Sequence, residues 1–205
     1  AVHEGAGTGN DLLYVLENAG SPKLWLAQRL DKATSGVVVC CKSAELTKQV
    51  QGRWSEAIKR YRALVKGKPQ PQALQSTLLA HDGRGKDAHS VIETVAPSVA
   101  PANSWVTLRL GTGRKHQLRL QLAEVGHPIL MDDKHGDFRA NKQLRRAQGE
   151  REGPKPNLLM LHAEHVSLPH PVTGQRLNVQ APLPEMFVAL GASELSLSDD
   201  AQPDS

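Results

Sequence analysis

Asp31 is the first side chain in the sequence whose type and setting suggest chemistry, because a carboxylate can act as a nucleophile or a base. It lies between two apolar segments, 24–30 and 37–41. We predict two buried strands joined by a short polar loop, with the acid at the start of the loop. Loops held by a rigid sheet often carry reacting groups. An Asp beside Thr-Ser-Gly is equally typical of a turn in which it accepts backbone N–H bonds, so both interpretations stay open.

The elements that must position such a residue follow from hydrophobic periodicity and from helix start and stop signals. Gly126 and Pro128 favour a helix over 115–125, although its leucines also fit a strand. The other predicted helices are 11–18, ended by Gly20, 43–54, capped by Ser43, and 184–190. The predicted strands are 59–66, 74–79, 90–95, 105–110, 158–161 and 177–179. Strands and helices without a regular βαβ rhythm indicate an α+β fold.

The charge of the chain is unevenly distributed. The 205 residues include 25 Lys and Arg against 21 Asp and Glu, a net charge of +4. The segment 192–205 holds four acids and no base, so the remaining body has 25 bases against 17 acids, or +8. A body this basic favours a polyanion as partner, because neutralised phosphates release counterions. Ordinary solubilising surface charge is the alternative.

Several classes of protein are disfavoured by what the sequence lacks. Cys40 and Cys41 are adjacent in a strand and face opposite ways, so we expect reduced thiols and neither a disulfide framework nor a zinc site. The histidines follow no recognisable ligand spacing, so we expect them to make structural hydrogen bonds and we expect no metal. No apolar run reaches the roughly 18 residues of a membrane span and no signal peptide is visible. We expect a cytoplasmic protein without a membrane partner.

Six motifs, taken in order along the chain, resemble the RluA family of pseudouridine synthases. They are Arg-Leu-Asp-x-x-Thr-Ser-Gly at 29–36, Lys-x-Tyr-x-Ala-x-Val at 59–65, Gly-Arg-x-His-Gln-x-Arg at 113–119, Gly-His-Pro-Ile at 126–129, Leu-His-Ala at 161–163 and His-Pro-x-Thr-Gly at 170–174. The resemblance runs from residue 2 to residue 190. Asp-Asp-Lys-His-Gly-Asp at 132–137, followed by a basic insert, is most similar to the RluC branch, which modifies large-subunit ribosomal RNA.

The resemblance implies a fold and a reaction. The fold is the pseudouridine synthase fold, a mixed, mainly antiparallel sheet with flanking helices and a central RNA-binding cleft. The reaction isomerises specific uridines, and it needs no cofactor because there is no redox change. A carboxylate captures or stabilises the sugar when the glycosidic bond breaks, as nucleophile or as base. Asp31 matches the essential aspartate of the family.

By the same resemblance, three more residues surround Asp31. Arg119 matches the arginine that pairs with the aspartate, and its guanidinium can bind a carboxylate bidentately and keep it ionised in a dry pocket. Tyr61 matches the tyrosine that stacks near the target base, with a core aromatic as the alternative. Leu161 matches the apolar residue against the flipped base, with simple core packing as the alternative. We predict Asp31, Tyr61 and Arg119 as catalytic.

Further residues are predicted to bind the substrate. The uridine must leave its stack, and Arg29 is a candidate wedge for the gap. The other predicted substrate-binding residues are Lys32, Arg114, Lys115, His116 and Gln117. Candidate phosphate contacts in the basic insert are Lys134, Arg139, Lys142, Arg145 and Arg146. Departures from the family pattern at Gln28, Gln121 and His135 bear on substrate fit and local hydrogen bonding more than on the type of reaction.

The prediction is therefore a pseudouridine synthase catalytic domain over 1–191, without the opening strands of the family, and an acidic disordered tail over 192–205. The expected partner is RNA, namely 23S ribosomal RNA or a ribosome precursor, and we expect a monomer. The alternative is a non-catalytic RNA-binding module that assists ribosome assembly and tolerates loss of Asp31. A metal-dependent nuclease is a weaker alternative, because Asp132 and Asp133 are adjacent and poorly placed to share a metal.

Overall fold

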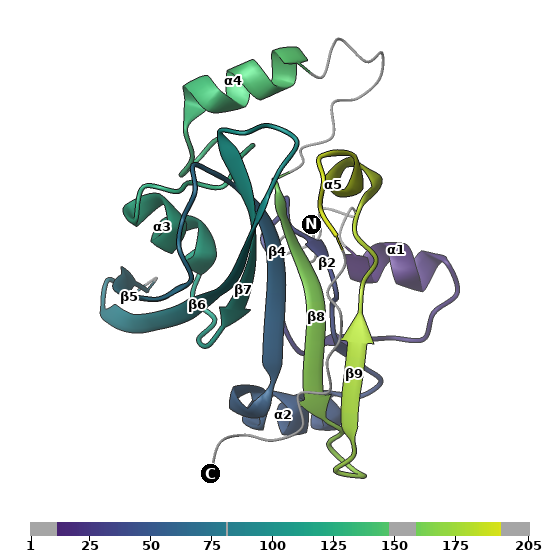
Figure 1. Cartoon of the computed structure of the whole chain (residues 1–205). Helices are drawn as coiled ribbons and strands as arrows, with labels where there is room; N and C mark the ends of the chain where they lie inside the picture. The colour runs from purple at the N-terminus through teal and green to yellow at the C-terminus, as the bar shows by residue number, and fades with distance from the viewer. Residues whose placement is uncertain (1–11, 81, 148–158, 194–205) are drawn as a thin grey trace.

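Nine strands and five α-helices position the site in the computed structural model, which describes residues 12–80, 82–147 and 159–193 (Figure 1). The strands are β1 Trp25–Leu26, β2 Ser35–Gly36, β3 Cys40–Cys41, β4 Ile58–Lys66, β5 Gln72–Leu79, β6 Gly85–Pro97, β7 Asn103–Leu110, β8 Leu161–Pro169 and β9 Arg176–Gln180. The helices are α1 Leu12–Asn18, α2 Ala44–Gly52, α3 Gln117–Glu124, α4 Phe138–Ala147 and α5 Glu185–Ala189, with a 3₁₀ turn at Trp54–Glu56.

Seven of these strands form the central sheet, in the order β2-β8-β4-β7-β6-β5, with β9 also paired to β8. All pairings in this sheet are antiparallel except that of β2 with β8. β1 and β3 form a separate antiparallel pair. The predicted α+β class with a mainly antiparallel sheet is confirmed, and most predicted elements are present within a few residues of their expected ends.

The segment around Asp31 differs from its prediction. Instead of two long buried strands, β1 and β3 pair over only two residues each, Trp25 with Cys41 and Leu26 with Cys40. The loop between them contributes β2, which runs parallel to β8. Gly36 has a φ of +114°, and a Cβ there would collide with the backbone of Ala163. Only glycine allows this close approach, which fixes the Asp31 loop to the sheet.

The predicted strand 158–161 is wrong in its extent, because β8 begins at Leu161 and continues to Pro169. Every residue of β8 is buried, including His162, Glu164 and Ser167. Because several residues of β8 are polar, the hydrophobic pattern of the sequence did not indicate a buried strand over this range. They are tolerated because partners from distant segments satisfy them: Ser35 contacts His162, Arg62 pairs with Glu164, and Arg176 donates to Ser167.

Two apolar clusters hold the elements in place. The larger joins β4, β7 and β8 to α3 and α5, and Trp105 contacts Phe187 with ring centroids 5.2 Å apart. The smaller cluster packs the segment that carries β1 and β3, together with α2, against β8, and includes Val37 and Val166. The Asp31 loop is anchored in both clusters, through Leu30 and Ala33 in the larger one and Ala27 and Val37 in the smaller one. Ala192, the first residue of the expected tail, is buried against the larger cluster.

The expected features at the two ends of the chain fall on residues 1–11 and 194–205, outside the described residues. Cys40 and Cys41 are free thiols, as predicted. Among the helices of the described segments, none has the length and apolar character that crossing a membrane requires.

Candidate active site

One cleft of about 1210 Å³ collects all ten predicted site residues. Its walls are the loop between β1 and β2 on one side and the start of α3 on the other, with β4 and the first residue of β8 between them. The predicted residues that line it are Arg29, Asp31, Lys32, Tyr61, Arg114, Lys115, His116, Gln117, Arg119 and Leu161. Segments far apart in the sequence therefore converge on one place, as the motifs suggested.

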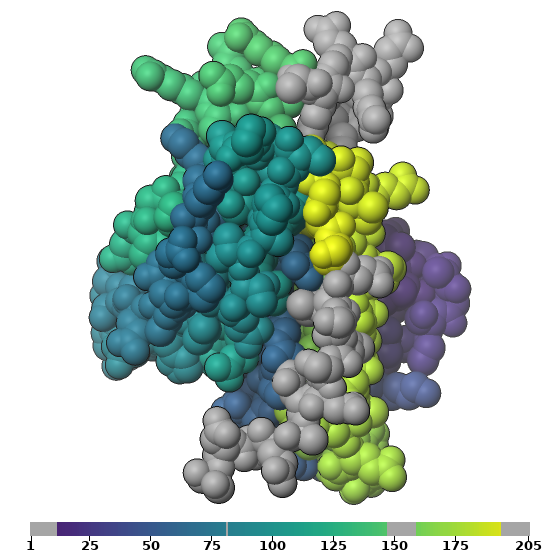
Figure 2. All heavy atoms as spheres, in the orientation of Figure 1, coloured from purple at the N-terminus to yellow at the C-terminus, as the bar shows by residue number. Residues whose placement is uncertain are grey.

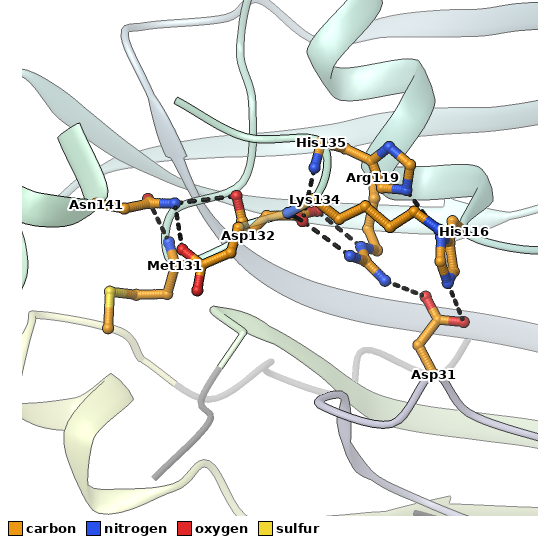
Figure 3. A network of polar contacts seen from close by, with 9 residues as sticks. Asp31, His116, Arg119, Met131, Asp132, Lys134, His135 and Asn141 are labelled. Carbon is orange, nitrogen blue, oxygen red and sulfur yellow. Dashed lines mark hydrogen bonds and ion pairs between the residues drawn. The ribbon is translucent and has the colours of Figure 1, made fainter. Parts of the chain in front are cut away.

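Arg119 bridges two carboxylates inside this cleft (Figure 3). Its Nη1 donates to Asp31 Oδ2 at 3.2 Å. Its Nε and Nη2 donate to the two carboxylate oxygens of Asp132 at 2.7 and 2.8 Å. The expected contact with Asp31 is present, but the bidentate partner is Asp132. The two hydrogen bonds to Asp132 fix the plane of the guanidinium group, so that its remaining nitrogen, Nη1, points at Asp31.

Asp132 is in turn held rigidly by its own loop. Its side chain is fully buried, and Oδ1 also accepts the backbone N–H groups of Lys134 and His135, both at 3.0 Å. Asn141 of α4 closes the loop from behind, donating to Asp132 O at 2.9 Å and accepting from Met131 N at 2.7 Å. Gly136 completes the turn, because a Cβ there would meet the backbone of Asp132.

The charges in this network reinforce one another. Burial alone raises the pKa of the Asp132 carboxyl, but the hydrogen bonds from Arg119 and His135 N outweigh it, so the pKa lies below its ordinary value. Burial alone lowers the pKa of Arg119, and its bonds to Asp132 and Asp31 reverse the effect, so the pKa is raised. The cleft thus contains a permanent cation within reach of Asp31.

Two histidines extend the network. His116 Nδ1 and His135 Nε2 are 2.8 Å apart, so one ring donates a proton to the other, while His116 Nε2 lies 3.8 Å from Asp31 Oδ1. Burial, aided by Arg119 and Lys134, lowers the pKa of both rings despite the opposing effect of Asp31. His116 has a left-handed backbone with φ of +54°, an uncommon conformation for a residue other than glycine. Such strain is often concentrated at functional sites.

Tyr61 and Leu161 form the apolar part of the cleft. Tyr61 is only 8% exposed, and burial together with the nearby Asp31 raises the pKa of its hydroxyl to about 12. The tyrosine therefore stays protonated at neutral pH, which makes it a poor base and leaves its ring as the useful surface. Leu161 is buried as well, but it lines the cleft.

The remaining predicted residues divide into two groups. Arg29, Lys32, Arg114 and Lys115 are exposed and form a basic rim. Gln117 is 3% exposed, and its amide is engaged inside the protein: it donates to His89 O and accepts from Thr112 Oγ1 and Arg114 N. These bonds make Gln117 a brace for the loop that carries Arg114.

Sequence reasoning missed four residues of the cleft and its supports. Asp132 was weighed only as a metal ligand, although it follows Arg119 closely enough for a loop to return its carboxylate. His135 was noted only as a departure from the family. Thr34 and Lys59 line the cleft, and the buried Thr34 Oγ1 has no hydrogen-bond partner among the described residues. No periodicity could have revealed these residues.

Among the described residues, no group of three or more His, Cys, Asp or Glu side chains is arranged to hold a metal ion. Several histidines instead make the structural hydrogen bonds that were predicted. His127 Nδ1 bonds to Lys66 O, His162 Nδ1 contacts Ser35 Oγ, and His170 Nδ1 accepts two backbone N–H groups.

Comparison with known proteins agrees with this geometry. A family model described as RNA pseudouridylate synthase matches residues 4–124. A tRNA pseudouridine synthase C of Salmonella typhimurium is 35% identical over an alignment 189 residues long that covers 80% of this chain and 70% of that protein. A ribosomal large subunit pseudouridine synthase C of Pasteurella multocida is 32% identical over an alignment 208 residues long that covers 94% of this chain and 62% of that protein.

A solved structure shares the fold. The human RNA pseudouridylate synthase domain containing 1 superposes with a TM-score of 0.73, covering 99% of this chain and 90% of that one, at 21% identity. The predicted pseudouridine synthase fold is thereby confirmed. The structural likeness shows the fold, and the sequence matches show the family. The chain is a member of the RluA family of RNA pseudouridylate synthases, and thus an isomerase.

Proposed function

We propose that this enzyme isomerises specific uridines of large-subunit (23S) ribosomal RNA, with Asp31 as the group that acts on the ribose. The observation that carries the proposal is the ion pair between Asp31 and Arg119 in a cleft with a basic rim. A pocket that only bound phosphates would gain nothing from a carboxylate at its centre. Membership of an enzyme family also argues against the alternative of a non-catalytic binding module.

The proposed reaction breaks the N1–C1′ bond of uridine, turns the uracil, forms a C5–C1′ bond and releases the C5 proton. Asp31 acts by one of two routes. As a nucleophile it bonds to C1′ while uracil leaves with the electron pair, and this bond breaks when C5 attacks C1′. As a base it takes a proton from the sugar and returns it to the sugar when the C5–C1′ bond forms. In both, the ion pair with Arg119 holds the carboxylate in position. The guanidinium needs no rearrangement, because Asp132 already holds it in place.

Tyr61 and Leu161 are proposed to contact the detached uracil. Both line the cleft beside Asp31 and present apolar surface. A tyrosine with a pKa of about 12 keeps its proton, so stacking is its proposed role, and another group or water takes the C5 proton. Arg29 at the exposed rim is proposed to fill the gap that the flipped uridine leaves, with Lys32, Arg114 and Lys115 near the flanking phosphates.

Ribosomal RNA is proposed as substrate for two reasons. The match to the ribosomal large subunit synthase of Pasteurella multocida covers 94% of this chain, against 80% for the transfer RNA synthase. The basic insert after Asp137 is also most similar to the RluC branch. Transfer RNA is the second candidate, because the Salmonella typhimurium protein has the higher identity. The predicted monomer, the cytoplasmic location and the domain boundaries stay predictions.

The test compares tritium release from C5-labelled transcripts of 23S ribosomal RNA, 16S ribosomal RNA and a transfer RNA pool, without added metal. We expect release from the 23S transcript with the wild type and none with Asp31→Asn, while RNA binding by the variant stays within about threefold. Release from transfer RNA alone would shift the proposal to the second candidate. Turnover by Asp31→Asn at the wild-type rate would refute the proposed role of Asp31.

A further inference from the structure

Helix α4 has two chemically distinct faces. Ala140 and Leu144 pack against the larger apolar cluster, and Asn141 between them is fully buried. The opposite arc of the helix carries Phe138, Arg139, Lys142, Arg145 and Arg146, as the helical repeat of 3.6 residues requires. Phe138, Lys142 and Arg146 follow at intervals of four residues and so lie in one row, about 6 Å apart along the axis. The helix forms a ridge at one end of the molecule (Figures 1 and 2).

Phe138 stands out because it belongs to the basic face and not to the apolar one. Its exposed fraction is 66%, whereas the other phenylalanine of the chain, Phe187, is completely buried. A phenylalanine side chain that is exposed among cations buries little apolar surface and so contributes little to the stability of the fold. Its flat ring would gain from stacking on an unpaired base, an interaction that every base can make.

The charges on this face are largely unneutralised. Arg145 donates to both carboxylate oxygens of Asp133, and Asp137 binds Lys66 Nζ at 2.6 Å. For Arg139, Lys142 and Arg146, no ion pair is found within the described segments. Three cations that have no ion pair within the described residues lie on the same face as one exposed aromatic ring. This matches the pattern of single-stranded nucleic-acid sites, where charges that follow the nucleic-acid backbone accompany a ring on which bases stack.

The ridge is also rigidly joined to the candidate active site. Asp137 Oδ1 accepts the N–H groups of Arg139 and Ala140 at the start of α4, which fixes the helix direction. Asn141 then binds both Met131 N and Asp132 O, and Asp132 holds Arg119 (Figure 3). RNA held on α4 would therefore lie in a fixed relation to Asp31, and not on a flexible arm.

We propose that α4 is a docking ridge for single-stranded RNA next to the modified uridine, with Phe138 stacking on one base and Arg139, Lys142 and Arg146 neutralising phosphates. The proposal rests on the proposed function, because it takes RNA to be the substrate. It adds a prediction about the form of that RNA: the segment that contacts α4 is unpaired, as in a loop or bulge.

The test measures binding of a fluorescent single-stranded 12-mer RNA and of the matching duplex over a range of salt concentrations. Replacing Arg139, Lys142 and Arg146 by Gln should reduce the salt slope of single-strand binding by about 2, since each phosphate on a single strand contributes about 0.7. Replacing Lys23, Lys48 and Lys86 by Gln removes the same charge from exposed sites that do not line the cleft, and should change the slope less.

Phe138→Ala should weaken single-strand binding about tenfold without changing the salt slope, because stacking is worth roughly 1–3 kcal/mol per base. Duplex binding should change by less than twofold, and Phe138→Trp should restore single-strand affinity. Unchanged melting temperatures would show that the fold is intact. Equal single-strand binding by the wild type, Phe138→Ala and the α4 triple variant would overturn the proposal and leave the ridge to an acidic protein partner.

Turnover separates this proposal from the proposed function. On the RNA that the wild type modifies, the α4 variants should need about tenfold more RNA for half-maximal rate, with the rate at saturation kept within about twofold. If the wild type modified no RNA, the proposed function would fail, whereas the binding comparison of the α4 variants would still decide the role of the ridge. A loss of saturating rate equal to that of Asp31→Asn would contradict a pure docking role.

Discussion

Two arginines in this protein each donate two hydrogen bonds to a buried carboxylate, but the surroundings of the two pairs differ. Arg62 of β4 binds Glu164 of β8 at 3.0 and 3.4 Å, with side chains 6% and 0% exposed, inside the sheet. Arg119 of α3 binds Asp132 at 2.7 and 2.8 Å, but its third corner reaches Asp31, which is 24% exposed and faces the cleft. The pair of Arg62 and Glu164 joins two strands, whereas the pair of Arg119 and Asp132 leaves Nη1 of Arg119 to bind a second carboxylate, that of Asp31.

The difference shows that an arginine–carboxylate pair is not in itself a sign of function. Removing two ions from water costs about as much as their attraction returns, so a closed pair such as that of Arg62 adds little net stability. The pair of Arg119 has the same cost but provides a preset cation beside Asp31. Replacing the two arginines should therefore affect different quantities: stability at Arg62 and turnover at Arg119.

The largest effect is expected from Arg62→Ala, which leaves the carboxylate of Glu164 buried without its cation. The free energy of unfolding should fall by about 3–5 kcal/mol, as found when one partner of a buried pair is removed. Urea unfolding measures this loss. Turnover per folded molecule should stay within about threefold. The double variant Arg62→Met, Glu164→Leu should regain most of the stability, and a double variant as unstable as the single one would contradict the explanation.

Arg119→Lys should have the opposite profile. Lysine keeps the charge but cannot bind Asp132 with a fork and contact Asp31 as well. We expect the saturating rate of pseudouridine formation to fall about a hundredfold, equivalent to about 2.7 kcal/mol. Tritium release under single-turnover conditions gives the rate, and Arg62→Lys serves as the matched control. If both variants lost turnover equally, the distinction between the two pairs would be invalid.

A smaller effect on turnover is expected from Asp132→Asn. The amide keeps the size of the carboxylate but loses its charge and presents N–H donors where the arginine donates. Because Asp132 holds Arg119 and does not itself line the cleft, the saturating rate should fall about tenfold while the RNA concentration for half-maximal rate is unchanged. A change confined to RNA affinity would mean that Asp132 shapes the binding surface instead.

The smallest effect concerns pH, and it involves histidines beside both arginine pairs. Burial lowers the pKa of His116, His135 and His162 below their ordinary value. The unfolded chain therefore takes up protons more readily than the folded one, so stability should fall as pH drops below the ordinary histidine pKa of about 6.5. The pKa of Asp132 is lowered in the folded protein, so its contribution to stability is present above the ordinary aspartate pKa of 3.8. That contribution is lost only as the pH falls below this value.

Urea unfolding between pH 8 and pH 5 measures this slope. His135→Phe should make it shallower, because one of the three rings no longer titrates, and stability that rises toward pH 5 would contradict the assignment. At the site, acid should also reduce turnover, since protonated His116 and His135 would direct two donors at each other across 2.8 Å.

Local periodicity in the sequence predicted the α+β class and most elements, and the resemblance of two motifs to the RluA family predicted the meeting of Asp31 with Arg119. The sequence pattern failed where burial depends on distant partners. Glu164 makes β8 look too polar for a buried strand until Arg62 is placed opposite it. Asp132 could not be assigned to Arg119, because the loop geometry, including the left-handed Met131 with φ of +63°, decides where its carboxylate points.

The pairing of β2 with β8 has a consequence for how the enzyme is made. Asp31, Tyr61 and Arg119 all precede β8 along the chain, yet β8, which starts at Leu161, lies between β2 and β4 in the sheet. Ser35 and His162, which meet at this junction, are 127 positions apart. A nascent chain thus carries its proposed catalytic groups long before the strand that aligns them leaves the ribosome, and closing so long a loop is a late, slow event. Activity should therefore arise only after β8 has been synthesised and has entered the sheet.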